Sequence, residues 1–458
     1  MTDLIVRTLH RLSLQMPGRV FVPGQDHYNA TTAIWAKSDR TPRAVVHCHA
    51  AQDVQAAIRA ARSCDIPLSV RGGGHDWAGR ALCDGLVIDL SGMKRVNLYL
   101  QNGTARVGGG TRASALLTAI EPFGMAAVTG SCGPVGMAGL TLGGGYGPLI
   151  GRFGLALDNL LSAEVVLSDG RIVTAWHDRE EELFWALRGG GGNFGVVTDM
   201  HVQLHYLSSV RSGMLVYPFT EARTVLEGCA AISASAPDDL TVQLGFVTGA
   251  DDKPVVLVVP TWCGPAEEGE RRTGPFLRLG TLLAGTVEAM SYKASLAAFD
   301  HFIVNGQRTF METCWLPPMD DGSIAPFIDA MKHAVSPGCG LFTHEFKGAA
   351  SRVPTDATAF GLRRDHLLVE ILAATDEQVH GRHREWAGDA LRAFDAVALP
   401  GGYPNLLAPG DDDRAAWSFG INANRLGRAK RRYDPDNVFR STIPLPALQP
   451  PMRAVLTR

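Results

Sequence analysis

The feature that most restricts the fold is a glycine-rich segment, residues 128–147, with the sequence VTGSCGPVGMAGLTLGGGYG. Its twenty residues include eight glycines and a single cysteine, Cys132. Glycine at this density gives the backbone too much freedom for an ordinary strand or helix. The segment therefore either makes a tight structural crossing or lies against a flat or phosphate-bearing ligand. Two more glycine clusters, at residues 72–74 and 189–192, pose the same alternatives.

Length and charge limit the class of protein. A chain of 458 residues exceeds the roughly 250–300 residues at which single cores stop growing, so more than one domain is expected. With 46% hydrophobic and 19% charged residues, the composition is that of a compact globular protein. The net charge of −3 provides no cationic surface, so neither nucleic acid nor an anionic membrane is an expected partner. The basic run GRAKRRYDP, residues 427–435, is expected to be a solvated helix end.

The sequence also bears on location. No run of about 18 apolar residues is present that could span a membrane. The N-terminal residues lack the apolar core of a secretory signal. We therefore expect a cytoplasmic protein.

Cysteine and histidine spacing does not predict a metal site. None of the eight cysteines lies in a CxxC pair or at zinc-ligand spacing. His201 and His205 share a face of a predicted strand but lie too far apart along it to bind one ion. Apart from Cys132, the cysteines are expected to be buried as small apolar side chains; they are Cys48, Cys64, Cys83, Cys229, Cys263, Cys314 and Cys339.

The pattern along the chain predicts an α+β fold with two domains. Residues 1–205 combine helices, strands and three glycine-rich loops, and one helix is predicted around Val54 and Ile58 from their helical spacing. Residues 206–402 alternate strand-like runs with amphipathic helices, which indicates an antiparallel sheet with helices on one face. Residues 403–458 are rich in glycine, proline and asparagine, and we expect them to return to the first domain.

The glycine loops alone leave two interpretations open. RGGGH, residues 71–75, directly follows a predicted strand, and backbone N–H groups without side chains could hold a dinucleotide there. Glycine clusters also occur in plain turns. This loop lacks the GxGxxG spacing and the following helix of a Rossmann fingerprint, which disfavours an NAD-dependent dehydrogenase. The chain contains no GxxxxGK[ST] phosphate loop.

Four motifs taken in order are more specific than the glycines. Together they closely resemble those of the berberine bridge enzyme-like FAD-linked oxidases, within the vanillyl-alcohol oxidase superfamily. The resemblance covers nearly the whole chain and implies a PCMH-type FAD-binding domain with an inserted substrate domain. The motifs are SVRGGGHDWAG, VTGSCGPVGMAGLTLGGGYGPLIGRFGLALDN, LRGGGGNFGVVT and YPNLL followed by NRLGRAKRRYDPDNVF.

The resemblance implies FAD held by two covalent bonds. In the family subgroup with doubly attached flavin, the histidine of RxGGH bonds the 8α-methyl group of the isoalloxazine, and the cysteine of GxCxxVG bonds C6. These positions are His75 and Cys132 here; the alternatives are an unlinked loop histidine and an inert buried thiol. Further flavin contacts are expected from Arg71, Gly72, Gly73, Gly74, Asp76, Thr129, Gly130, Ser131, Val135, Gly136, Gly139, Gly143, Gly195, Val197 and Asn405.

Two residues are candidates for the catalytic base. Tyr403 matches the tyrosine of the family's YxN motif, but an ordinary tyrosine pKa near 10 requires a cationic or hydrogen-bonding neighbour for work near neutral pH. Glu370 in HLLVEILAA is the competing base, because berberine bridge enzyme uses a glutamate from this neighbourhood. Strand alternation puts His344 and Glu345 on opposite faces, and both, like Gln243, are interpreted as structural.

The resemblance implies an oxidase of secondary metabolism. It would remove hydride from an alcohol or hemiacetal carbon of a carbohydrate or glycosylated natural product, and dioxygen would be reduced to hydrogen peroxide. Amine oxidation, oxidative C–C bond formation and flavin binding without turnover stay as alternatives. The expected partners are a small-molecule substrate and dioxygen; the sequence does not identify the substrate, the electron acceptor or the oligomeric state.

Overall fold

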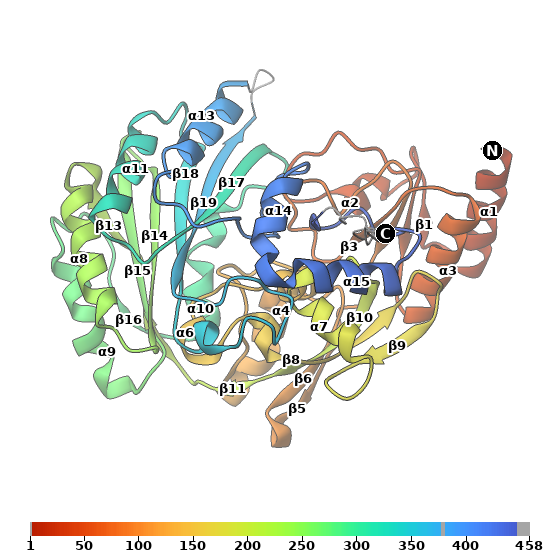
Figure 1. The fold of residues 1–458 in the computed structure, drawn as a ribbon, viewed down its shortest axis with the longest axis horizontal. Helices are drawn as coiled ribbons and strands as arrows, with labels where there is room; N and C mark the ends of the chain where they lie inside the picture. Colours follow the sequence, from red (N-terminus) through yellow and green to blue (C-terminus); the bar gives the residue numbers. More distant parts are fainter. Residues whose placement is uncertain (1, 377–380, 447–458) are drawn as a thin grey trace, which may run out of the picture.

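The computed structural model describes residues 2–376 and 381–446, and three large β-sheets organise this part of the chain (Figure 1). The first sheet has the strand order β1-β2-β4-β3, and β2, β4 and β3 run parallel. All four residues of β4 are buried, as expected for a parallel strand covered on both faces. The strands are β1 (Val20–Phe21), β2 (Ala44–His47), β3 (Leu68–Arg71) and β4 (Leu86–Asp89).

Helix α3 (Ala51–Ser63) connects β2 to β3 and confirms the predicted helix. Val54 and Ile58, whose spacing predicted it, are fully buried. The carboxylate of Asp53 ties the helix start to the preceding loop, because it accepts the backbone N–H groups of His49 and Ala50. Helix α1 (Thr2–Gln15) packs along α3.

The second sheet is antiparallel and has the order β5-β6-β10-β8-β9. Its helices and strands enclose the largest hydrophobic core of the described residues. The strands are β5 (Val96–Tyr99), β6 (Thr104–Gly108), β8 (Leu160–Val166), β9 (Ile172–Ala175) and β10 (Val196–Gln203), with β7 (Met125–Ala126) and β11 (His205–Tyr206) paired separately. The helices of this part of the chain are α4 (Ala113–Ile120), α5 (Met137–Gly143), α6 (Ile150–Phe153) and α7 (Glu181–Gly190), whereas α2 (Tyr28–Thr32) packs against β2 of the first sheet.

The third sheet is antiparallel and has the order β16-β12-β15-β14-β18-β19-β17, with β13 paired to β15. Its strands are β12 (Val210–Ser212), β13 (Leu215–Pro218), β14 (Leu240–Thr248), β15 (Pro254–Trp262), β16 (Glu288–Met290), β17 (Arg308–Leu316), β18 (Cys339–Phe346) and β19 (His366–Thr375). Helices α8, α11 and α13 cover one face (Figure 1), which confirms the predicted sheet with helices on one side. The helices of this region are α8 (Ala222–Ala234), α9 (Ala266–Thr273), α10 (Tyr292–Ala297), α11 (Asp321–Lys332), α12 (Ala349–Arg352) and α13 (Gly381–Arg392).

The C-terminal helices α14 (Asp412–Phe419) and α15 (Ala423–Tyr433) return to the first part of the chain, where α15 packs on α7 (Figure 1). The basic run was expected to be a solvated helix end, and for Lys430 this is wrong. Lys430 is buried, and its ammonium group contacts Asp434 at 2.6 Å and the carbonyl oxygen of Asn193 at 2.9 Å. Arg431 and Arg432 are exposed as expected. Burial lowers the pKa of Lys430. Its hydrogen bonds to the carbonyl oxygens of Asn193 and Phe439 anchor the helix to the neighbouring chain.

The cysteines follow the predicted division. Seven are buried and free, whereas Cys132 is only partly buried. Among the described residues, no group of three or more His, Cys, Asp or Glu side chains is arranged to hold a metal ion. No helix within residues 2–376 or 381–446 has the length and apolar character needed to cross a membrane.

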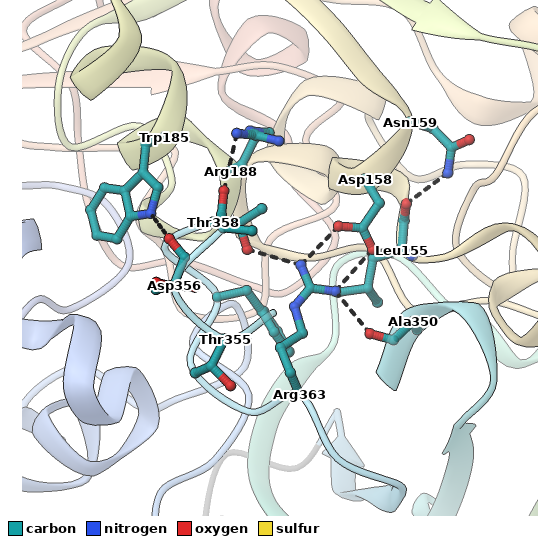
Figure 2. A network of polar contacts seen from close by, with 12 residues as sticks. Leu155, Asp158, Asn159, Trp185, Arg188, Ala350, Thr355, Asp356, Thr358 and Arg363 are labelled. Carbon is teal, nitrogen blue, oxygen red and sulfur yellow. Dashed lines mark hydrogen bonds and ion pairs between the residues drawn. The ribbon is translucent and has the colours of Figure 1, made fainter. Parts of the chain in front are cut away.

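A buried ion pair joins the segment between β18 and β19 to the short helical turn Ala156–Asn159 that precedes β8 (Figure 2). Arg363 binds both carboxylate oxygens of Asp158, at 2.9 and 2.8 Å, and it also donates to the carbonyl oxygen of Ala350 and the hydroxyl of Thr358. The Arg363 side chain is fully buried. Trp185 donates to the carbonyl oxygen of Asp356 in the same segment. These contacts fix the chain immediately before β19, which carries Glu370.

We predict that Asp158→Ala destabilises the fold strongly. Removal of one partner leaves the Arg363 charge buried without its counter-ion, which costs about 3–5 kcal/mol. The control is Asp389→Ala, because the Asp389–Arg392 pair is about two-thirds exposed and such pairs contribute about 0–1 kcal/mol. Urea unfolding of both variants checks this; equal midpoints would contradict the assigned role of Arg363.

Candidate active site

One cleft of about 350 Å³ is lined by residues from all three sheets. This volume is within the range of ligand sites. Leu68 of β3, Val197 of β10 and Glu370 of β19 mark the three contributions. Of the residues predicted for the site, those that line the cleft are Gly72, Gly73, Gly74, His75, Asp76, Gly130, Ser131, Cys132, Val135, Gly136, Gly139, Gly195, Val197, Glu370, Tyr403 and Asn405.

Two glycine loops cross with their backbones in contact. A Cβ atom at Gly73 would lie 2.4 Å from the Cα of Gly136, and one at Gly136 would lie 2.5 Å from the nitrogen of Gly73. Neither approach is possible for a residue with a side chain. The crossing holds the loop that carries His75 against the loop that carries Cys132, so both residues face the same cleft. The glycine-rich segment therefore makes a tight crossing, and it also lines the cleft.

His75 is held as a neutral imidazole. Its ring stacks on Trp35 with centroids 4.6 Å apart and an interplanar angle of 4°. The pKa of His75 is lowered to about 4, chiefly by burial; the Glu370 charge opposes this change and Arg112 adds to it. A lone pair on a ring nitrogen is therefore available at neutral pH.

Cys132 lies in a loop that Asp300 fixes. The carboxylate of Asp300, from a short turn (Asp300–Phe302), accepts the backbone N–H of Gly133 at 3.2 Å. Burial raises the pKa of the Cys132 thiol, and the charges of Glu370 and Asp300 act in the same direction. The sulfur is therefore a protonated thiol that is partly open to the cleft.

Tyr403 and Asn405 are seated on the run of glycines that ends the glycine-rich segment. A Cβ atom at Gly144 would lie 2.8 Å from the Tyr403 ring, and one at Gly143 would lie 2.1 Å from Asn405. The Tyr403 hydroxyl accepts the N–H of Gly145 at 3.0 Å and the side-chain amide of Asn405 at 3.1 Å.

The electrostatic balance keeps Tyr403 protonated. Burial raises the pKa of Tyr403 to about 12, although the hydrogen bonds from Gly145 and Asn405 lower it. The Glu370 charge raises the pKa as well, which shows that the two candidate bases interact. Because both bonds from the protein occupy lone pairs of the Tyr403 oxygen, its own proton is free to point into the cleft.

Glu370 belongs to a hydrogen-bonded group on the third sheet. Its Oε1 lies 3.1 Å from Nε2 of His344 on β18. On the other side of the imidazole, Nδ1 contacts Nε2 of Gln243 on β14 at 2.9 Å and Oγ of Ser131 at 3.3 Å. The sequence interpretation of His344 and Gln243 as structural did not find this arrangement, because it depends on which strands pair.

Three predicted contact residues do not line the cleft. Arg71 is buried in an ion pair with Asp89 at 3.0 Å. Thr129 contacts the hydroxyl of Tyr292 at 3.0 Å. Gly143 faces Asn405, as described above. These three residues therefore contact the loops of the cleft without lining the cleft itself.

Several residues that line the cleft were not predicted. Tyr146 packs edge-on against Tyr403, with ring centroids 4.9 Å apart, and its hydroxyl contacts Nε2 of His366 at 2.7 Å. Arg80 donates to the carbonyl oxygens of Asn405 and Leu407 and so fixes the segment that bears Tyr403. Tyr146 directly follows the glycine run 143–145, and this position could have marked it as a lining residue from the sequence. No pattern in the sequence marks Arg80 in this way.

The lining fits an FAD group. Glycine backbones in the lining provide N–H groups without side chains, as a pyrophosphate requires. The aromatic and ionisable side chains of Trp35, His75, Cys132 and Tyr403 line the same cleft. These residue types suit a flat conjugated ring that accepts hydride.

Comparisons with known proteins agree with this fit. An FAD binding domain matches residues 42–175, and a family described as berberine and berberine-like matches residues 402–446. The (R)-6-hydroxynicotine oxidase of Paenarthrobacter nicotinovorans is 30% identical, over 93% of this chain and 96% of the relative.

Solved structures share the fold. The 6-hydroxy-D-nicotine oxidase of Arthrobacter nicotinovorans superposes with a TM-score of 0.83 at 27% identity, over 93% of this chain and 97% of that one. Glucooligosaccharide oxidase from Acremonium strictum, known with a 6-S-cysteinyl, 8α-N1-histidyl FAD, has a TM-score of 0.82 at 21% identity, over 97% and 100% of the two chains.

We predict that Gly73→Ala loses bound flavin. The added methyl group forces the two loops apart by contact with Gly136, and overpacking of this kind costs about 1–3 kcal/mol, which weakens flavin affinity about 5- to 150-fold. Gly274→Ala is the control, because a Cβ atom there meets nothing within 4 Å. The ratio of flavin to protein absorbance after purification measures the effect. A fully yellow Gly73→Ala protein would show that the crossing does not position the site.

Proposed function

Because the chain belongs to the berberine bridge enzyme-like family of FAD-linked oxidoreductases, we propose that it is an oxidase acting on a carbon that bears a hydroxyl group. The bound flavin supplies the hydride acceptor, and dioxygen takes up the two electrons to give hydrogen peroxide. The observation that carries this proposal is the seat of Tyr403, whose hydroxyl receives two hydrogen bonds in the cleft that also contains Glu370.

We propose that Tyr403 and Glu370 share the task of the base. A phenol with a pKa of about 12 is protonated at neutral pH, so Tyr403 can accept a proton only while it passes its own proton on. Glu370 is the carboxylate that influences Tyr403, and it is the acceptor in this scheme. The substrate hydroxyl therefore loses its proton to Tyr403 as the hydride leaves the carbon.

We also propose that His75 and Cys132 each form a bond to the flavin. Each bond replaces one flavin C–H and one imidazole N–H or thiol S–H, and the two hydrogens leave on dioxygen as hydrogen peroxide. The neutral state of His75 supports the first bond, because only the unprotonated ring nitrogen is a nucleophile. The placement of Cys132 beside the same cleft supports the second, as does the doubly linked FAD of glucooligosaccharide oxidase.

The surface around Glu370 favours a substrate with an apolar body. Phe342 of β18 pairs directly with Glu370, and on the same face Met311 of β17 pairs with Leu372 of β19. Phe342 packs with Leu257 in an apolar cluster on this side of the sheet. Because these apolar side chains lie beside the polar group of Glu370, His344 and Gln243, the face suits a substrate that combines an apolar body with a hydroxyl group. We therefore favour an alcohol on an aromatic or apolar skeleton, such as a glycosylated secondary metabolite.

Oxidation of an amine is the second candidate. The relative that favours it is the 6-hydroxynicotine oxidase, since nicotine carries an amine nitrogen and the identity is 30%. An unprotonated amine has no hydroxyl proton to lose. Flavin reduction by such a substrate would therefore not depend on Tyr403, which separates the two candidates.

We predict that the flavin stays attached to the denatured chain. Intact mass should exceed that of the bare polypeptide by one FAD, and a denaturing gel should fluoresce. His75→Ala and Cys132→Ala should each retain one link, and the double variant should retain none. Cys314→Ala is the matched control, because this cysteine is buried in the other core. A bare-chain mass for the unaltered protein would contradict both attachments.

We predict that Tyr403→Phe slows flavin reduction by an alcohol about 10²–10⁴-fold, because proton transfer loses its carrier. The flavin should remain bound. Tyr217→Phe is the control, since this hydroxyl donates to the carbonyl oxygen of Phe276 far from the cleft. Anaerobic rapid mixing measures both rates. An unchanged rate in Tyr403→Phe would exclude the tyrosine and leave Glu370 as the sole base.

A further inference from the structure

Two buried titratable side chains, Tyr146 and His366, have no role in the proposed reaction. They are 4% and 2% exposed, and the Tyr146 hydroxyl lies 2.7 Å from Nε2 of His366. Nδ1 of the same imidazole lies 2.6 Å from the carbonyl oxygen of Arg364. The imidazole also stacks on the Phe346 ring, with centroids 4.3 Å apart. Both ring nitrogens and the ring plane of His366 are therefore fixed by protein contacts.

The partners of His366 determine which ring nitrogen carries its proton. A carbonyl oxygen only accepts hydrogen bonds, so Nδ1 donates to Arg364. The pKa of His366 is lowered to about 3, chiefly by burial, so the ring is neutral and Nε2 has a lone pair. Tyr146 therefore donates its hydroxyl proton to Nε2. Because this proton is committed to the imidazole, the Tyr146 hydroxyl serves as an anchor and not as an acid or base.

Tyr146 connects this anchor to Tyr403 in two ways. Its ring packs edge-on against the Tyr403 ring, with centroids 4.9 Å apart. Along the chain it directly follows Gly145, whose N–H donates to the Tyr403 hydroxyl at 3.0 Å. The glycine run 143–145 has no side chains, so Tyr146 is the first residue after it whose side chain can hold this end of the run.

Backbone hydrogen bonds hold the other edge of the glycine run. The carbonyl oxygens of Gly144 and Gly145 accept N–H groups from the turn Ala156–Asn159, at 3.1 and 3.2 Å. These bonds fix the run but do not touch the Tyr403 ring. That ring meets the backbone of Gly144 on one side and the edge of Tyr146 on another. The place of the Tyr403 ring therefore depends on where Tyr146 is held.

One strand carries this anchor and the second candidate base. His366 begins β19, and Glu370 lies four residues later on the same face. Leu368, between them, is fully buried in the largest core, whereas Leu367 belongs to the core beneath the helices of the third sheet. The buried ion pair described above fixes the chain just before this strand. β19 therefore positions one candidate base directly and reaches the other through the imidazole.

We propose that His366 is a positioning residue for Tyr403: it holds the Tyr146 hydroxyl, and the Tyr146 ring holds Tyr403 against its two hydrogen-bond donors. This inference rests on the proposed function, in which Tyr403 takes the substrate proton. The bonds from Gly145 and Asn405 both lower the pKa of Tyr403. A phenol that drifts away from these donors therefore releases its own proton less readily, and the relay slows.

Amide hydrogen exchange at Gly145 reports this position without any substrate. In the flavin-loaded protein, the bond to the Tyr403 hydroxyl protects this N–H. Tyr146→Phe keeps the ring and removes only the anchoring oxygen, and we expect exchange at Gly145 to become about 5- to 10-fold faster. Mass spectrometry of peptides that span the glycine run measures the rate. Tyr217→Phe is the control and should leave the rate unchanged, because its buried hydroxyl donates to Phe276 in the other core.

A double-mutant cycle separates this role from a general loosening of the fold. In Tyr403→Phe the Gly145 N–H has lost its acceptor, so the addition of Tyr146→Phe should change its exchange rate by less than about twofold. Equal acceleration in both backgrounds would overturn the proposal, because Tyr146 would then act on the glycine run and not through Tyr403.

Two variants of His366 provide an independent test. A glutamine can place its carbonyl oxygen near the position of Nε2 and accept the Tyr146 hydroxyl, whereas leucine cannot. We expect His366→Leu to accelerate exchange at Gly145 as Tyr146→Phe does, and His366→Gln to stay near the unaltered rate. Equal rates in the two variants would reduce His366 to a packing role and overturn the proposal. If neither variant holds flavin, the cycle at Tyr146 and Tyr403 decides alone.

Failure of the proposed function gives a different result. Because hydrogen exchange requires no substrate, coupled exchange in a protein that oxidises no alcohol would contradict only the use of Tyr403 as a base. Slow flavin reduction in Tyr403→Phe, together with equal acceleration of exchange in both backgrounds, would keep the oxidase function and overturn the role of His366.

Discussion

The contact between the backbones of Gly73 and Gly136 is the constraint on which the site depends. One glycine follows the parallel sheet and the other precedes α5, so the crossing is a joint between two separately built halves of the cofactor cradle. No side chain fits between them. The two loops can approach this closely because neither glycine carries a Cβ atom. As a consequence, His75 and Cys132 line the same cleft.

The candidate reactive groups come from other segments of the chain. β19 places Glu370 in the cleft, and antiparallel pairing with β18 brings His344 alongside it. Tyr403 arrives from a third segment and fits only because the residue beneath its ring is Gly144. The loops that line the cleft and the candidate reactive groups thus come from different segments. The buried Arg363–Asp158 pair and the contact of Tyr403 with Gly144 join these segments.

Local patterns in the sequence predicted local structure well. The spacing of Val54 and Ile58 predicted α3, and alternating strands predicted the third sheet with helices on one face. What could not be predicted depends on partners distant in the chain. The burial of Lys430 follows from its contacts with Asp434 and the chain near Asn193, which no helical pattern of charges reveals.

The candidate site divides in the same way. The resemblance pointed to His75, Cys132, Glu370 and Tyr403, and all four line one cleft. The contacts of His344 with Glu370 and Gln243 depend on how β18 pairs with β19 and β14, so alternation along one strand could not reveal them. The order of these groups along the chain has a consequence for biosynthesis. A ribosome synthesises the two crossing loops, with His75 and Cys132, long before it reaches Tyr403 and the C-terminal residues Phe439 and Ile443 that close the lining of the cleft, so the cleft forms only after nearly the whole chain has been made.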